Sequence, residues 1–144
     1  MLKLDLKIRS AGVNDIASIQ RLLKRTGLYF EPVDGYKELY EDQLRLDPES
    51  IVVVERGSSI VGVVFFVFSP LLTHVFHLAV AARYRRKGIG AMLLREVEDR
   101  VRKNGGNYIS SYIEKGNKAS LKLCDSLEFE KYNVGLVARY KEVR

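Results

Sequence analysis

The segment from Leu78 to Leu94 constrains the fold of this chain most, because a buried strand, a basic loop and a helix start follow one another directly. Free backbone N–H groups at a helix N-terminus carry a positive partial charge and bind phosphate. Gly88 and Gly90 permit a ligand to approach the backbone closely. Four cations fall within five consecutive positions of the loop: Arg83, Arg85, Arg86 and Lys87. The segment therefore predicts a phosphate-binding loop between a strand and a helix.

Two other kinds of phosphate loop do not fit these residues. A Walker loop requires a Lys-Ser or Lys-Thr pair after its second glycine, whereas Ala91 and Met92 follow Gly90. The dinucleotide fingerprint G-x-G-x-x-G requires a third glycine where this chain has Leu93. The loop is therefore assigned to neither class.

The hydrophobic pattern predicts a mixed α/β (α+β) fold in one domain over residues 1–144. Alternation and turn signals predict strands at 2–10, 51–56, 60–68, 71–80, 108–113 and 129–142. Helical spacing predicts helices at 14–27, 34–46, 88–104 and 117–127. The short turns in 51–80 imply antiparallel neighbours, and the later strand–helix–strand succession implies one parallel pair. We expect a mostly antiparallel sheet flanked by helices.

Composition narrows the class of protein further. Hydrophobic residues make up 47% and charged residues 29% of the chain, as in ordinary globular proteins. Cys124 is the only cysteine, so no internal disulfide can form, and a zinc site of several thiolates is excluded. The apolar run from 60 to 68 is too short to cross a bilayer. We expect a cytoplasmic protein without a metal or a membrane partner.

Two motifs resemble those of the GCN5-related N-acetyltransferase (GNAT) superfamily. The first is the run from His77 to Leu94, in which Arg85, Gly88 and Gly90 meet the pattern Gln/Arg-x-x-Gly-x-Gly/Ala. The second runs from 117 to 130 and is similar to the family pattern N-x-x-A-x-x-L-Y-E-x-L-G-F. Both occur in the family's order and at its separation.

This resemblance implies acetyl-CoA as co-substrate and an amine as acceptor. It implies that two adjacent parallel strands splay apart and that the thioester lies between them. Strand backbone would pair with the pantetheine arm, loop amides would hold the pyrophosphate, and an asparagine would bind from the other side. The residues implied in cofactor binding are Leu78, Ala79, Val80, Arg85, Arg86, Lys87, Gly88, Ile89, Gly90, Ala91 and Asn117.

The residues expected to be catalytic match the family's pattern less closely than the two motifs do. Cys124 stands where the family commonly has the tyrosine that protonates the departing thiolate, and Tyr112 and Tyr132 are substitutes by proximity in sequence. The attacking amine must first lose a proton, and a histidine can accept one near neutral pH. Strict alternation puts His74 and His77 on opposite faces of their strand, with His74 on the face of Leu78 and Val80. We expect His74 to be the base.

The acceptor stays open between a protein N-terminus, a lysine and a small amine. Four aromatic residues are candidates to line its site: Tyr29, Phe30, Tyr36 and Tyr40. The alternative to an enzyme is a binding module for an acyl-CoA or a nucleic acid. Nucleic-acid binding predicts cations spread along one face, whereas here they centre on one loop, so we expect no nucleic-acid partner. The apolar final strand could pair with a second copy as a homodimer.

Overall fold

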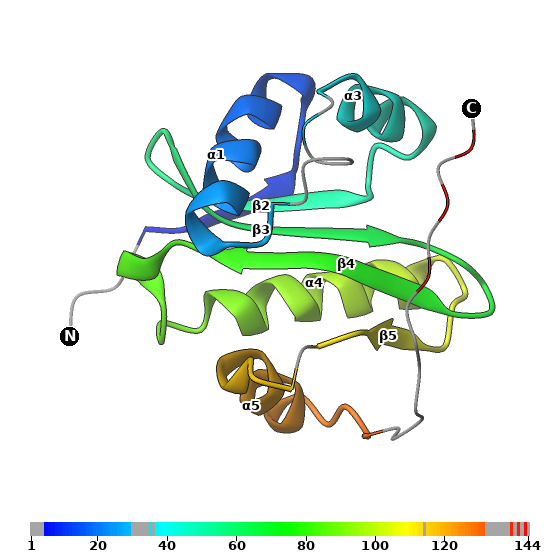
Figure 1. Ribbon diagram of the computed structural model, residues 1–144. Helices are drawn as coiled ribbons and strands as arrows, with labels where there is room; N and C mark the ends of the chain where they lie inside the picture. The colour runs from blue at the N-terminus through cyan, green and yellow to red at the C-terminus, as the bar shows by residue number, and fades with distance from the viewer. Residues whose placement is uncertain are drawn as a thin grey trace.

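The computed structural model describes residues 5–29, 35, 37–113, 115–131, 139, 141 and 143. Five strands form one sheet in chain order (Figure 1): β1 (Lys7–Ser10), β2 (Ile51–Arg56), β3 (Ser59–Val67), β4 (Thr73–Val80) and β5 (Ile109–Ser111). Neighbouring strands are antiparallel except β4 and β5, which are parallel. The predicted mixed sheet with one parallel pair is therefore confirmed.

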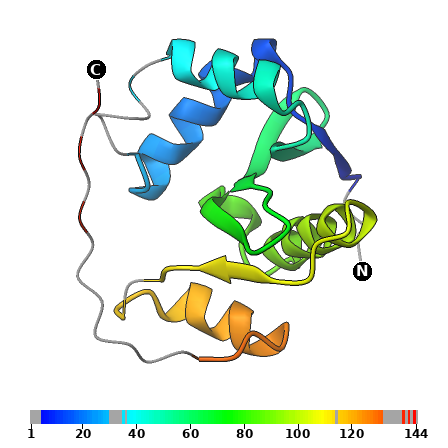
Figure 2. The same ribbon diagram turned by 90° about the vertical axis from the view of Figure 1, so that its right-hand side faces the viewer.

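Helices cover both faces of this sheet (Figure 1). The helices are α1 (Ile16–Thr26), α3 (Lys37–Leu46), α4 (Ile89–Lys103) and α5 (Lys118–Ser126), and two 3-10 turns are η1 (Val13–Asp15) and η2 (Ala82–Tyr84). Helices α1 and α3 pack on one face and α4 on the other. Figure 2 shows α5 (orange) beside β5 (yellow), at the opposite end of the molecule from α1 and α3. No helix of the described residues is long and apolar enough to cross a membrane.

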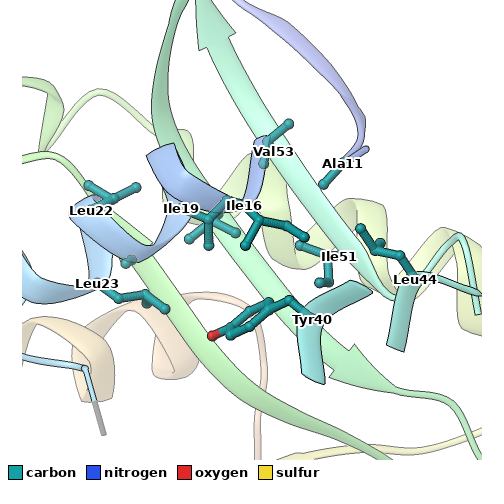
Figure 3. Close-up of a cluster of buried hydrophobic side chains, with 11 residues drawn as sticks. Ala11, Ile16, Ile19, Leu22, Leu23, Tyr40, Leu44, Ile51 and Val53 are labelled. Atoms are coloured by element: carbon teal, nitrogen blue, oxygen red, sulfur yellow. The ribbon is translucent and has the colours of Figure 1, made fainter. Parts of the chain in front are cut away.

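A first apolar cluster joins α1 and α3 to the sheet (Figure 3). Ile16, Ile19 and Leu23 recur at helical spacing on one face of α1, and each is at most 1% exposed. They pack against alternate residues of β2, such as Ile51 and Val53. This apolar stripe explains why α1 lies on the sheet.

A second apolar cluster joins α4 to the other face of the sheet. Ile89, Leu93 and Val97 lie one turn apart on α4 and are at most 1% exposed. The helix approaches β3 closely at Gly62, where a Cβ atom would lie 2.8 Å from Ile89 Cγ2. This contact positions the first turn of α4, which directly follows the basic loop.

The predicted element boundaries agree best where turn signals are strong. Gly27 ends α1 in the left-handed conformation, with φ 76°. Within the described residues, the predicted strands over 2–10, 71–80 and 108–113 are shorter, as β1, β4 and β5. Residues 129–131 are not a strand, and the rest of the predicted last strand lies almost entirely outside the described residues.

Candidate active site

The sheet opens at the carboxyl end of β4. Parallel pairing with β5 covers only Thr73 with Ile109, His74 with Ser110 and Val75 with Ser111, whereas β4 continues to Val80. The Ala81 amide donates to the Val61 carbonyl of β3 at 2.8 Å. Because backbone groups alternate in direction along an antiparallel strand, Ala79 also faces β3, and Leu78 and Val80 face the open side. This edge of β4 can pair with an extended ligand as an added strand.

The basic loop after β4 leads into α4 through two residues with left-handed backbone. Arg86 has φ 61° and Gly88 has φ 82°. Within the described part of the chain, no acceptor is hydrogen-bonded to the backbone amides of residues 86–91. The next amide, that of Met92, bonds the Gly88 carbonyl at 3.0 Å. Six successive amides at a helix N-terminus are thus available to an anion.

The loop cations lie around these amides. The side chains of Arg85, Arg86 and Lys87 are exposed. The Arg85 Nε group donates to the Val80 carbonyl at 3.3 Å, which directs this cation toward the open edge of β4. Gly90 has a separate packing role, because a Cβ atom there would lie 2.9 Å from Leu123 Cδ2 of α5. The loop therefore combines charge, free amides and close packing of α5.

A β-bulge in β4 corrects the expected orientation of the two histidines. The register pairs Phe65 with His77, Phe66 with Val75 and Val67 with His74. Phe76 is therefore the extra residue, and alternation is interrupted there. Cross-strand partners share a face, and Phe65 packs on the cluster of α1 and α3, so His74 and His77 both lie on that face. The prediction of opposite faces was wrong, and Leu78 and Val80 pack instead on the α4 cluster.

A hollow of about 530 Å³ lies beside His74, and its lining residues are Leu72, His74, Val75, Phe76, Ser110 and Tyr112. The His74 ring makes a T-shaped contact with Phe76, with centroids 4.7 Å apart, and lies 4.8 Å from the Tyr112 ring. His74 Nδ1 is 2.8 Å from Ser110 Oγ. Burial lowers the pKa of His74 below its usual value, so the ring is neutral at neutral pH. The hollow therefore holds a neutral histidine among apolar and hydroxyl groups.

Of the other predicted catalytic residues that the structure describes, Tyr112 lies in this hollow and Cys124 lies elsewhere. Tyr112 lines the hollow and is 79% exposed. Cys124 lies on α5 and is not part of the described lining. Burial, and secondarily the charge of Asp125, raise the pKa of Cys124, so its thiol stays protonated at neutral pH. Tyr132 lies outside the described residues.

Asn117 has a structural contact in addition to its predicted role. Its side-chain oxygen accepts a hydrogen bond from the Ser120 amide at 3.2 Å and caps α5.

Of the β4 residues predicted to bind the cofactor, Ala79 has no free group to offer a ligand, because its backbone faces β3 and its side chain is buried.

Two of the four aromatic residues predicted to line the acceptor site, Tyr29 and Tyr40, lie in the described part of the chain. Tyr40 is 5% exposed and packs edge-on against Phe65 in the core. Tyr29 is half-buried, with the Lys24 ammonium 4.7 Å from its ring centre. Phe30 and Tyr36 lie outside the described residues. We infer that Tyr40 stabilises the fold rather than contacting an acceptor.

Four residues that line the hollow were not among the predicted site residues: Leu72, Val75, Phe76 and Ser110. Ser110 comes from β5, and only the parallel register brings it to His74, 36 positions earlier in the chain. Phe76 lies two positions after His74, so strand alternation brings it to the same face, and the two rings are in contact. The one available signal was a pair of serines, 110 and 111, within an otherwise apolar predicted strand.

Comparisons with known proteins agree with this fold. They identify the chain as an acyltransferase. The chain belongs to the Acetyltransferase (GNAT) family, whose sequence model matches residues 16–129. This family uses acetyl-CoA.

One relative and two solved structures illustrate the similarity. An acetyltransferase of Photorhabdus laumondii is 25% identical over 125 residues, which are 87% of each chain. The crystal structure of Ard1 from Thermoplasma volcanium is 21% identical, with a TM-score of 0.79 over 90% of this chain and 86% of that one. A chain of the NatC complex bound to Gag peptide and CoA is 20% identical, with a TM-score of 0.78 over 90% and 87%. At these identities, the two structures establish the fold.

Proposed function

We propose that this enzyme acetylates the α-amine of a peptide, or another primary amine of similar basicity, at the hollow beside His74. The observation that carries the proposal is a neutral histidine in an uncharged hollow where β4 and β5 part. The single cysteine suits a reducing compartment, and we propose the cytoplasm.

The residues around the open edge of β4 fit acetyl-CoA. The free backbone groups of Leu78 and Val80 would pair with its pantetheine arm, and the amides of residues 86–91 would bind its pyrophosphate. The Arg85 side chain would first release the Val80 carbonyl. When bound, the coenzyme supplies the activated acetyl group as a thioester. The side-chain amide of Asn117 retains its N–H donors for the coenzyme, since only its oxygen caps α5.

His74 would accept the proton of the acceptor amine, because it is neutral and lies in the hollow. Tyr112 is better located than Cys124 to donate a proton to the departing thiolate, because Tyr112 lines the same hollow. Its ring centre is 4.8 Å from that of His74. We therefore propose His74 as base and Tyr112 as acid.

The chemistry of the hollow favours a weakly basic amine. Its described lining contains no carboxylate that would attract an alkylammonium ion, and a histidine with a lowered pKa is a weak base. At pH 7.5, about one third of an α-amine is neutral, against about 0.1% of a lysine side chain. The neutral form is the nucleophile, so the α-amine has a roughly 250-fold advantage in reactive fraction.

Release of free coenzyme thiol from acetyl-CoA tests this proposal with two matched peptides. One has a free α-amine and no lysine, and the other has the same sequence with a blocked N-terminus and one lysine. We expect kcat/KM at pH 7.5 to be more than about 50-fold higher for the free α-amine, from the difference in neutral fraction. A preference for the lysine peptide would contradict the proposed acceptor.

Two matched variants on β4 test the proposed base. We expect His74→Gln to lower kcat/KM by about 10²-fold or more. His77→Gln, on the same strand and face, should change it by less than about threefold. Wild-type kcat/KM, plotted against pH, should fall below about pH 6.5, because His74 becomes protonated in acid. The same plot for His74→Gln should lack this fall. Equal losses in both variants would argue against His74.

A further inference from the structure

The hydroxyl of Ser110 lies between the His74 ring and the backbone of β4. His74 and Ser110 are register partners in the parallel pair. Ser110 Oγ lies 2.8 Å from His74 Nδ1 and 3.4 Å from the Thr73 carbonyl oxygen. Thr73 is fully buried. Ser110 therefore contacts one ring nitrogen of the proposed base and one buried acceptor.

A count of protons gives two possible arrangements. A serine hydroxyl has a single proton, and a neutral imidazole has one protonated nitrogen. If Ser110 donates to Thr73, then His74 donates from Nδ1 to Ser110, and Nε2 keeps a free lone pair. If Ser110 donates to Nδ1 instead, then Nε2 carries the proton and cannot accept another. Only the first arrangement leaves Nε2 able to act as a base.

The adjacent serine has a contact like the one that the first arrangement requires. Ser111 Oγ donates to the Val75 carbonyl, also at 3.4 Å, and a carbonyl can only accept. Both serine hydroxyls of β5 thus reach carbonyls of β4 at the same distance. In addition, Nε2 has no hydrogen-bond partner among the residues that the structure describes. It lies on the ring edge away from Nδ1, which the 2.8 Å contact holds against β5.

We propose that Ser110 is a positioning residue that keeps His74 protonated at Nδ1, so that Nε2 is free to accept the proton of the acceptor amine. This inference rests on the proposed function of His74. In the reaction, the amine proton passes to Nε2 and then to solvent, while the Nδ1 proton stays in its bond with Ser110. Aromatic contacts from Phe76 and Tyr112 hold the ring in place. His77 is the other described titratable group on this face of β4, and the Ser110 and Ser111 variants all keep it.

Nitrogen NMR of the imidazole side chains in the enzyme without substrates tests the tautomer directly. For the wild type we expect a protonated Nδ1 and an unprotonated Nε2 at pH 7.5. Ser110→Ala should shift His74 toward the tautomer protonated at Nε2, and Ser110→Thr should restore the wild-type signal. Ser111→Ala is the matched control and should leave the signal unchanged. A wild-type His74 protonated at Nε2 would overturn the proposal, even if no variant could be folded.

Kinetics complete the test. We expect Ser110→Ala to lower kcat about tenfold, less than the 10²- to 10⁴-fold typical for removal of a general base. KM for acetyl-CoA should be unchanged, and Ser110→Thr should recover most of kcat. Wild-type kcat in Ser110→Ala would refute the role of Ser110. If the wild-type enzyme acetylated no amine but His74 were protonated at Nδ1, the proposed function would be refuted. The hydrogen bond between His74 and Ser110 would still stand.

Discussion

Replacement of Gly62 by alanine tests the link between core packing and the loop. The new Cβ would lie 2.8 Å from Ile89 Cγ2 and 3.2 Å from Leu93 Cδ1. Carbon atoms pack best at about 3.5–4.0 Å, so α4 must move from β3 by roughly 0.7 Å. Ile89 is β-branched and 1% exposed, so it cannot rotate away. We expect Gly62→Ala to lower the free energy of unfolding by about 1–3 kcal/mol.

The same displacement should reach the proposed coenzyme site. Ile89 is the first residue of α4, and the free amides of residues 86–91 surround it. Because binding depends on donor geometry at the level of about 1 Å, KM for acetyl-CoA should rise about tenfold. The two measurements are urea unfolding followed by circular dichroism and initial rates of thiol release at varied acetyl-CoA.

Gly12→Ala is the control for this experiment. Gly12 has an extended backbone, with φ −113° and ψ 173°, and its nearest neighbour to a new Cβ would be Asp15 Oδ2 at 3.9 Å. This variant should match the wild type in stability within about 0.5 kcal/mol and in KM. If Gly62→Ala unfolded at the wild-type urea concentration with an unchanged KM, the close α4–β3 contact would not position the loop.

Three further changes test individual contacts. Asp15→Asn should cost about 1 kcal/mol at pH 7, because Asp15 is partly exposed and accepts 2.7 and 2.9 Å hydrogen bonds from Arg9. These bonds lower the pKa of Asp15. Their contribution to the free energy of unfolding is therefore present above about pH 4 and is lost as the pH falls through the lowered pKa. Urea unfolding of wild type and variant at pH 7 and in acid measures this loss. Arg86→Gly should raise the melting temperature, because glycine adopts φ 61° without strain, yet weaken acetyl-CoA binding in calorimetry; a lower melting temperature would refute the strain argument. Asn117→Ala should cost about 1 kcal/mol by removing the cap on the Ser120 amide, and an unchanged urea midpoint would show that this cap contributes nothing.

Much of the fold could be predicted because its signals are local. The apolar positions of α1 and α4 recur at helical spacing, and each helix has a glycine at one of its ends: Gly27 ends α1 and Gly88 precedes α4. The parallel pair followed from the order of strand, helix and strand. The predicted helix start at residue 14 was two residues early, because the chain first makes the η1 turn and α1 begins at Ile16.

The loop of the candidate site was predictable as a whole, whereas only His74 and Tyr112 of the hollow's lining were predicted. The cations and glycines between β4 and α4 are contiguous in sequence, so their joint role could be inferred without knowing the fold. The hollow is different, because it gathers residues from β4, from β5 and from the positions next to them, Leu72 and Tyr112. No sequence signal marked Phe76 as the bulged residue, since its position depends on pairing with β3.

The sequence by itself determined the strand, basic loop and helix start from Leu78 to Leu94, because backbone conformation there depends on neighbouring residues. Only the tertiary structure decided that His74 and His77 share a face and that Ser110 lies against His74. It likewise decided that Cys124 lies outside the described lining of the hollow while Tyr112 lies within it. The physical reason is that contacts between distant segments set strand register and helix packing. Alternative registers and packings of the same strands and helices differ in how much apolar surface they bury rather than in local propensity.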